Sequence, residues 1–318
     1  MADPLRILSL GAHDAYVERY VADHHLGPVH VDGIELNSEA VERAHERMKD
    51  VSGTFALGAA EDAPELFEPG SYDAVVAFEL IEHVPDPDGF LSACERMVRP
   101  TGRIYISTPA GTFGEGGNPH HLRTYRSIDL VDLLRRRGRL CDATVGSDGI
   151  ATASYTPAER FGDIAIYTGP GWETWSPHDI ERRGLGGSET AAVRLAEALS
   201  ELGWIVTVYG QVEQGCFRDV VFRHHEVFDP TEPRAALITS RLPEVFDRLV
   251  RADTTFLWAH DIDFGPRLTP QRASHIDHIL GLSRWHVRHL RGRYPFAANK
   301  IVQIRNGIVH AYFGGPTQ

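Results

Sequence analysis

The stretch RILSLGAHDA at residues 6–15 decides how the first half of this chain folds. The apolar residues at 6–10 are typical of a buried strand, and Gly11 follows directly, where the absence of a Cβ permits close backbone approach. Glu35 ends the next apolar segment, at residues 29–35. Because parallel sheets bind ligands beyond the carboxyl ends of their strands, Gly11 and Glu35 are predicted to share one binding site.

Short apolar segments alternate with helical ones through the rest of the first half. This alternation predicts a doubly wound, mostly parallel sheet of Rossmann type, in the α/β class. The candidate strands are residues 6–10, 29–35, 54–57, 74–78 and 102–107, and the candidate helices are residues 16–24, 38–49, 88–98 and 127–137.

A second pattern of the same kind begins after residues 146–160, which are small, polar and weakly periodic. We interpret them as a linker, and the alternative is that part of them forms the last strand of the first domain. DIAIYT at residues 163–168 predicts a strand, and GLGGSET at 184–190 predicts a glycine-rich turn that opens a helix. Further strands are expected at 205–209, 236–239, 255–259, 275–282 and 300–305, and helices at 188–202 and 284–294. The sequence therefore predicts two tandem Rossmann-like domains, at residues 1–150 and 162–318, joined by a linker at 151–161.

Composition and charge exclude several classes of function. The chain has 318 residues, of which 42% are hydrophobic and 24% charged, as in globular domains. A formal net charge of −12 argues against nucleic acid as a partner, because phosphate binding needs clustered lysine and arginine. Cys94, Cys141 and Cys216 show no metal or disulfide spacing, which indicates a reducing, cytoplasmic environment. No apolar run reaches the roughly 20 residues of a membrane span and no signal-peptide pattern is present, so an integral membrane protein is not expected.

Four motifs follow the first strand along the chain. They are YDAVVAFELIEHVPDP at residues 72–87, RMVRPTG at 96–102, ISTP at 106–109 and NPHHLR at 118–123. Together they resemble class I S-adenosylmethionine-dependent methyltransferases, over roughly residues 5–140. The resemblance implies S-adenosylmethionine as cofactor, with Glu35 accepting the ribose hydroxyls of its adenosine. The other implied cofactor-binding residues are Gly11, Ala60, Phe78 and Glu79.

The first loop departs from that family. The pattern D-x-G-x-G-x-G corresponds here to Ser9, Gly11, His13 and Ala15, so one glycine remains. The acidic residue that often contacts adenine corresponds to Ala59. Two alternatives stay open, an altered mode of cofactor binding and a domain retained for structure.

Histidine and glutamate side chains are candidates for the methyl-transfer chemistry. An oxygen acceptor needs a base, and His121 is the catalytic candidate because imidazole titrates near neutrality. A solvated loop histidine is the alternative. Glu79, Glu82 and His83 form E-x-x-E-H, a pattern that holds a divalent metal in some quinone O-methyltransferases, which this stretch resembles. Capping of a helix or turn by Glu82 and His83 is the favoured interpretation, so no metal site is predicted.

The second half contains three motifs in succession. GPGWETWSP at residues 169–177 precedes GLGGSET at 184–190 and GWIVTVY at 203–209. Glycines before a helix expose N–H groups to an anion, and the helix dipole assists. These segments resemble the N-terminal domain of retaining GT-B glycosyltransferases of the glycogen-synthase and mannosyltransferase type, family 4. The resemblance implies binding of a donor phosphate by Gly186 and Gly187, while an ordinary N-cap at Ser188 is the alternative.

Two later segments agree with this resemblance. LWAHD at residues 257–261 resembles the strand end where these enzymes place a histidine near the donor sugar, so His260 is a second catalytic candidate, and a core histidine is the alternative. RNGI at residues 305–308 resembles the turn that closes the domain. The nucleotide-binding domain would follow that turn, so we expect the nucleotide-sugar site to need a further domain or polypeptide.

The sequence therefore predicts a bifunctional transferase, or a fragment of one. A methyltransferase domain is expected to use S-adenosylmethionine, and a fused glycosyltransferase half to act with it on a small-molecule or glycan acceptor. The alternative is a non-catalytic binding or scaffold protein with two degenerate transferase domains.

Overall fold

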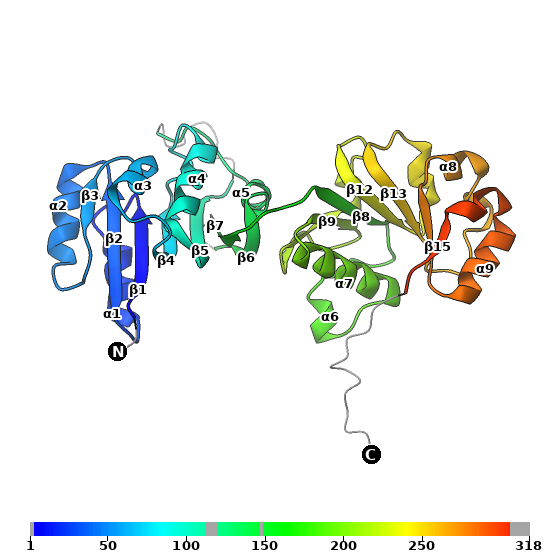
Figure 1. Cartoon of the computed structure of the whole chain (residues 1–318), viewed down its shortest axis with the longest axis horizontal. Coiled ribbons are helices and arrows are strands. Elements are labelled where there is room, and N and C mark those ends of the chain that lie inside the picture. The colour runs from blue at the N-terminus through cyan, green and yellow to red at the C-terminus, as the bar shows by residue number, and fades with distance from the viewer. Residues whose placement is uncertain (1–2, 112–119, 147–148, 306–318) are drawn as a thin grey trace, which may run out of the picture. The chain divides into compact units, whose positions relative to one another are not determined.

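The computed structural model describes residues 3–111, 120–146 and 149–305. The chain divides into two compact units, Met1–Glu159 and Arg160–Gln318, which are described separately (Figure 1). Each unit is built on its own sheet.

The first unit contains a seven-stranded sheet with the strand order β3-β2-β1-β4-β5-β7-β6. β1 to β5 run parallel, and β7 is antiparallel to both β5 and β6. The order reverses between β1 and β4, which is where an open α/β sheet leaves a crevice for a ligand. The strands are β1 (Leu5–Leu10), β2 (Val29–Glu35), β3 (Phe55–Leu57), β4 (Tyr72–Phe78), β5 (Val98–Pro109), β6 (Gly138–Val145) and β7 (Ile150–Pro157).

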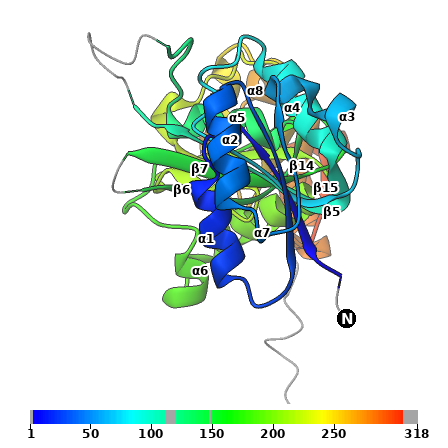
Figure 2. The same cartoon turned by 90° about the vertical axis from the view of Figure 1, so that its left-hand side faces the viewer.

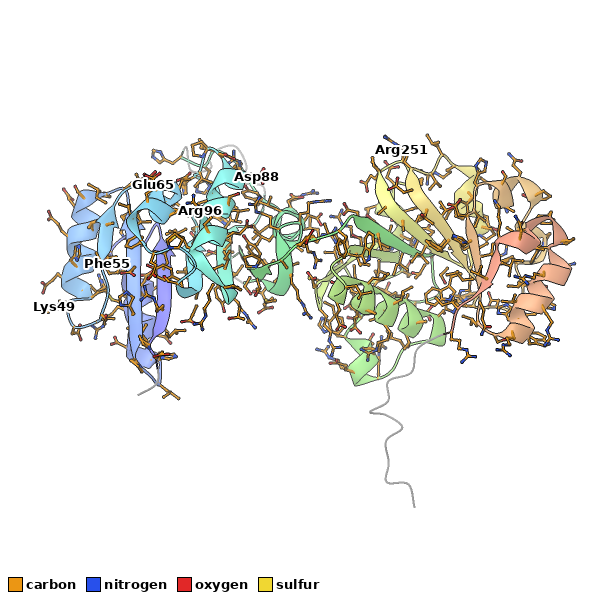
Figure 3. The ribbon with its side chains drawn as sticks, viewed as in Figure 1. Lys49, Phe55, Glu65, Asp88, Arg96 and Arg251 are labelled. Atoms are coloured by element: carbon orange, nitrogen blue, oxygen red, sulfur yellow. The ribbon has the colours of Figure 1, made fainter. Side chains whose placement is uncertain are left out.

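Helices of the first unit pack their apolar sides against this sheet. They are α1 (Tyr16–His24), α2 (Ser38–Arg47), α3 (Ala63–Leu66), α4 (Pro87–Met97) and α5 (Ser127–Arg135). Figure 2 shows α1 and α2 in the foreground, with α2 above α1 in that view. Val41 and Ala44 of α2 join a core cluster with Val31 of β2 and Phe55 of β3. Figure 3 labels Phe55, whose ring lies so close to Gly33 that a Cβ on this glycine would come within 2.4 Å of it. Gly33 therefore lets an aromatic ring cover the second strand.

β6 was not predicted from the sequence, and β7 corresponds to the last strand that was left open as an alternative to the linker. Most of β7 lies within the expected linker, 151–161, so the first sheet extends further along the chain than the pattern indicated. Ala151, Ala153 and Tyr155 are buried and alternate with less buried residues, which is the period of a strand. The signal was weak because two of these three inward side chains are alanines.

The second unit contains an eight-stranded sheet with the order β10-β11-β9-β8-β12-β13-β14-β15. Its strands run parallel except β10, which is antiparallel to β11. The mostly parallel α/β architecture predicted for both halves is thereby confirmed. The strands are β8 (Asp163–Gly169), β9 (Ile205–Gly210), β10 (Gly215–Phe217), β11 (Val220–His224), β12 (Arg234–Ser240), β13 (Ala252–Trp258), β14 (His278–Gly281) and β15 (Ile301–Gln303).

Two core clusters hold the second unit together. One packs Ala192, Val193 and Ala196 of α7 against β8, β9 and β11. The other gathers residues of α8 and α9, among them Val287 and Leu290, beside β13 to β15. The helices are α6 (Asp179–Arg182), α7 (Gly187–Glu201), α8 (Pro270–Ser274) and α9 (Arg284–Arg293).

A buried ion pair lies at the start of the second unit. Arg160 Nη1 lies 2.9 Å from Asp219 Oδ2, and the two side chains are only 4% and 3% exposed. Ser200 donates to the same carboxylate oxygen at 2.6 Å, and Arg160 Nη2 donates to the carbonyl of Trp204 at 3.1 Å. Arg160 therefore belongs to the second unit's interior, although the sequence placed it in a linker.

None of the helices within residues 3–111, 120–146 and 149–305 has the length and apolar character of a membrane span.

Candidate functional sites

The loop after β1 keeps a left-handed backbone although it has lost two glycines. Gly11, His13 and Ala15 have φ of 70°, 46° and 57°, respectively. Left-handed backbone costs a residue with a Cβ about 1–2 kcal/mol. A Cβ on Gly11 would also lie 3.2 Å from the Leu80 side chain. The departure seen in the sequence therefore changes the side chains of this loop but preserves its glycine-type conformation.

Glu35 is tied to this loop. The backbone N–H of His13 donates to Glu35 Oε2 at 3.0 Å, and the N–H of Asn37 donates to Oε1 at 3.0 Å. Each carboxylate oxygen keeps a further lone pair that can accept a ligand hydroxyl. The carboxylate thus holds two loops in place at the edge of the sheet and retains acceptor capacity.

The other residues predicted to bind cofactor follow the neighbouring strands. Ala60 is buried in the short turn after β3, and Phe78 ends β4 with 38% of its surface exposed. Glu79 follows with φ of 50°, and its N–H donates to the carbonyl of Ser107 at 3.0 Å. Gly11 and Glu35 lie at the carboxyl ends of β1 and β2, so the structure brings all five residues to one edge of the sheet, on both sides of the switch between β1 and β4.

Sequence reasoning missed a buried carboxylate beside this loop. Ser9, at the position of the family's aspartate, is 3% exposed, and its Oγ donates to Oε1 of Glu18 at 2.5 Å. Glu18 lies in the first turn of α1 and is 6% exposed. Burial raises the pKa of Glu18, while the hydrogen bond from Ser9 opposes the rise. The helical position of Glu18 gave no sign of this contact, because an acid in a first helical turn is favoured anyway.

A second cluster forms where two distant segments meet. Ligating atoms of Glu82, His83 and His121 all lie within 4.8 Å of one another. The rings of His83 and His121 meet edge to face with centroids 4.7 Å apart, and His83 Nδ1 lies 3.0 Å from the carbonyl of His120. Both carboxylate oxygens of Glu82 are buried and have no hydrogen-bond partner among the described residues. Glu82 therefore does not cap a helix or turn as we expected, and its carboxylate faces two imidazoles instead.

The second unit has a pocket of about 810 Å³ at the carboxyl ends of β8 and β12. Gly186 and Gly187 line it together with Glu189, Ser240 and Arg241. The helix α7 begins at Gly187 with Gly186 as its N-cap, so the alternative interpretation, an N-cap at Ser188, is wrong by two residues. Three arginines, at positions 183, 241 and 267, also line this pocket.

A buried hydroxyl and a strained arginine lie next to each other in the lining of this pocket. Ser240 is 1% exposed, and its Oγ has no hydrogen-bond partner in the described part of the chain. Arg241 has φ of 64°, and its guanidinium lies 3.4 Å from Glu189. A helix N-terminus, an arginine and a buried hydroxyl together form an arrangement that suits an anion.

His260 lies after β13 and is not itself part of the pocket lining. Burial, followed by the nearby Arg241, lowers its pKa to about 4, so the imidazole is neutral at pH 7. Its Nε2 is buried without a partner among the described residues, and its ring lies 4.3 Å from that of Trp258. Asp261, the next residue, does line the pocket. The turn at residues 306–308 lies outside the described residues, as do Asn118 and Pro119 of the first half.

The strand order and the loop after β1 define the first unit as a Rossmann-like domain whose strand order switches between β1 and β4. Residues 8–106 match the family profile described as a methyltransferase domain. The N-terminal region is a class I methyltransferase domain, of the kind that uses S-adenosylmethionine as cofactor.

Curated relatives match part of this chain. An 80-residue segment is 42% identical to a ubiquinone biosynthesis O-methyltransferase from Burkholderia vietnamiensis (strain G4 / LMG 22486), covering 24% of this chain and 34% of that protein. A ubiquinone biosynthesis O-methyltransferase from Pseudomonas aeruginosa (strain UCBPP-PA14) is 31% identical over 105 residues, covering 32% of this chain and 44% of that protein. This chain thus spans well under half the length of these relatives.

Solved structures show weaker likeness. The putative methyltransferase in complex with the Haloferax volcanii Trm112 methyltransferase activator aligns with a TM-score of 0.45 and 16% identity, covering 51% of this chain and 86% of that one. A SAM-dependent methyltransferase from Aquifex aeolicus aligns with a TM-score of 0.42 and 14% identity, covering 48% and 82%.

Proposed function

We propose that the first unit transfers a methyl group from S-adenosylmethionine to an oxygen of a small-molecule or glycan acceptor. The observation that carries this proposal is the convergence of Gly11, Glu35, Phe78 and Glu79 at one edge of a sheet that matches a methyltransferase profile. The printed names of the curated relatives, O-methyltransferases, support an oxygen acceptor. In such a transfer, alignment of acceptor, methyl and sulfur supplies much of the rate.

The cluster of Glu82, His83 and His121 fits a divalent cation, which revises our expectation that the chain has no metal site. A buried carboxylate whose two oxygens lack partners, next to two imidazoles, is a donor set that such a cation satisfies. A bound cation would lower the pKa of an acceptor hydroxyl. His121 would hold the cation, and through it would favour loss of the acceptor proton, in place of the free base that the sequence indicated.

For the second unit we propose binding of a phosphate-bearing sugar donor or acceptor, as the resemblance to GT-B glycosyltransferases implies. The supports are the pocket at the start of α7, the unpartnered Ser240 hydroxyl and the arginines around it. Gly186 and Gly187 would supply backbone N–H groups to the phosphate, and the neutral His260 would donate or accept a hydrogen bond. Sugar transfer would also need a site for the nucleotide of the donor. The protein would then act as a cytoplasmic bifunctional transferase, and a binding protein with two degenerate domains is the rival proposal.

The first experiment is calorimetric titration of S-adenosylmethionine into the chain and into Glu35→Ala. Removing the carboxylate is expected to weaken binding ~100-fold, because a ribose loses its charged acceptor and the loops lose their anchor. Glu42→Ala, an exposed acid on α2, is the matched control and is expected to bind like the unchanged protein. No binding by the unchanged chain at millimolar ligand would contradict the proposed methyltransferase function and favour the binding-protein alternative.

The cation is tested separately. We expect chelation, or Glu82→Gln, to abolish methyl transfer to a phenolic acceptor while S-adenosylmethionine affinity stays within about twofold, since the cluster serves the acceptor and not the cofactor. Full methyl transfer after chelation would contradict the proposed metal site.

A further inference from the structure

The carboxylate of Glu18 is a buried anion without a matching cation. Its side chain lies in the interior at 6% exposure, and its one hydrogen bond to another side chain comes from Ser9. Within the described residues, no lysine, arginine or histidine forms an ion pair with Glu18, and the charged neighbour that affects its pKa is an acid, Asp14. Burying a carboxylate is costly unless a cation or several donors compensate. The hydroxyl of Ser9 and a backbone N–H supply neutral donors, so the charge of this carboxylate has no cationic partner among the described residues.

The position of this carboxylate is informative. Ser9 lies near the end of β1, two residues before Gly11, at the place where the family's motif has an aspartate. Glu18 reaches this place from α1, on the other side of the loop. The acid missing from position 9 is thus replaced, in space, by an acid from position 18.

S-Adenosylmethionine, the expected cofactor, would pass over the end of β1. If Glu35 at the end of β2 holds the adenosine, the remainder of the ligand must pass over the end of β1 to reach Glu79 at the end of β4, because β1 lies between these two strands. S-Adenosylmethionine carries its positive charges, the sulfonium and the α-ammonium, in this remaining part. A carboxylate near the end of β1 is therefore complementary to the cationic part of the cofactor.

We propose that Glu18 binds the α-ammonium of S-adenosylmethionine, as a carboxylate relocated from the strand at position 9 to the helix α1. This inference rests on the proposed methyltransferase function and names a cofactor-binding residue that the sequence motif does not contain. Ser9 then acts as a positioning residue, since its hydroxyl fixes one oxygen of Glu18.

Two ligands test the proposal by calorimetry. One is S-adenosylmethionine, and the other is 5′-methylthioadenosine, which shares the adenosine and the sulfur but lacks the amino-acid part. Glu18→Gln keeps an oxygen acceptor for Ser9 and removes the charge. We expect this substitution to lower the affinity for S-adenosylmethionine by ~10- to 100-fold and the affinity for 5′-methylthioadenosine by less than about twofold.

The double variant Ser9→Asp with Glu18→Ala moves the carboxylate back to the strand. It is expected to recover S-adenosylmethionine affinity to within about fivefold of the unchanged protein, whereas Glu18→Ala alone is not. Equal weakening of both ligands by Glu18→Gln would overturn the proposal, because it would show that Glu18 only holds the loop. Unchanged S-adenosylmethionine affinity in Glu18→Gln would overturn it as well. If the unchanged protein binds neither ligand, the proposed function itself fails, and that result is distinct from both.

Discussion

The loop after β1 and the loop before α7 form an instructive pair. The first has one glycine and places three residues, Gly11, His13 and Ala15, in the left-handed region. The second has three glycines, yet of these only Gly184 is left-handed, with φ of 81°. At Gly187 an added Cβ would meet no atom within 4 Å. Gly11 is therefore required by its backbone conformation, whereas Gly187 has neither a left-handed backbone nor a close neighbour and borders open space at the start of a helix.

The largest predicted difference between the two units is the effect of acid on their stability. The pKa of His260 is lowered to about 4, below the ordinary value of 6.5 that holds in the unfolded chain. Between these values the unfolded chain binds a proton that the folded unit refuses, so the second unit loses stability as the pH falls from 6.5 to about 4, by at most about 3 kcal/mol. His260→Gln removes this dependence.

The five tryptophans, at positions 172, 175, 204, 258 and 285, all lie in the second unit, so tryptophan fluorescence follows its unfolding alone. Denaturant midpoints for the unchanged chain and His260→Gln should converge at pH 7.5 and diverge at pH 4.5. Equal pH slopes for the two proteins would show that His260 is not held neutral.

A matched pair of substitutions tests the two roles of glycine. Gly11→Ala puts a Cβ on a left-handed residue, 3.2 Å from Leu80, and should destabilise the first unit by ~1–2 kcal/mol. Gly187→Ala enters open space at a helical position, where alanine is favoured, so the second unit should keep or gain up to about 1 kcal/mol. Hydrogen exchange of peptides from each unit measures both effects in one protein. A loss of stability in Gly187→Ala would contradict the distinction between the loops.

Restoring a glycine in the first loop is expected to give a smaller gain in stability. Ala15→Gly relieves a left-handed backbone and should stabilise the first unit by ~1 kcal/mol, with the greater flexibility of unfolded glycine offsetting part of the relief. For a unit of this size the unfolding temperature should rise by ~2–4 °C. His13→Gly is the companion variant at an exposed site. A lower unfolding temperature in both variants would mean that the loop does not hold this conformation in solution.

The smallest effect concerns helix caps. Asn37 caps α2, since its side chain accepts from the N–H groups of Glu39 and Ala40, and Asn37→Ala should cost ~1 kcal/mol. Ser188 lies inside α7 and bonds to the neighbouring Glu189, so Ser188→Ala should cost no more than a few tenths of a kcal/mol. Equal losses of stability, measured by urea denaturation, would favour Ser188 as the N-cap, the alternative that the sequence left open.

Most of the strands that are rich in large apolar residues were predicted from the sequence within a few positions, because their burial shows in hydropathy. β7, whose buried side carries alanines, was predicted only as an alternative to the linker. β10 is a three-residue edge strand with little signal, whereas β11 was missed although Val220, Val221 and Phe222 are buried. The site was predicted where one residue follows one strand, as with Gly11 and Glu35. It was not predicted where distant segments converge, as with Glu18 at Ser9 or His121 at Glu82, since such contacts depend on the fold and leave no spacing to recognise.

The ion pair of Arg160 and Asp219 has a practical consequence for genetics. A gene segment that encodes the second half alone must begin before codon 160, because a product starting at 162 would leave the Asp219 carboxylate buried without its guanidinium. Exchange of the two halves between related genes is subject to the same limit. Recombination between codons 157 and 160 preserves both the last strand of one unit and the first charge of the other.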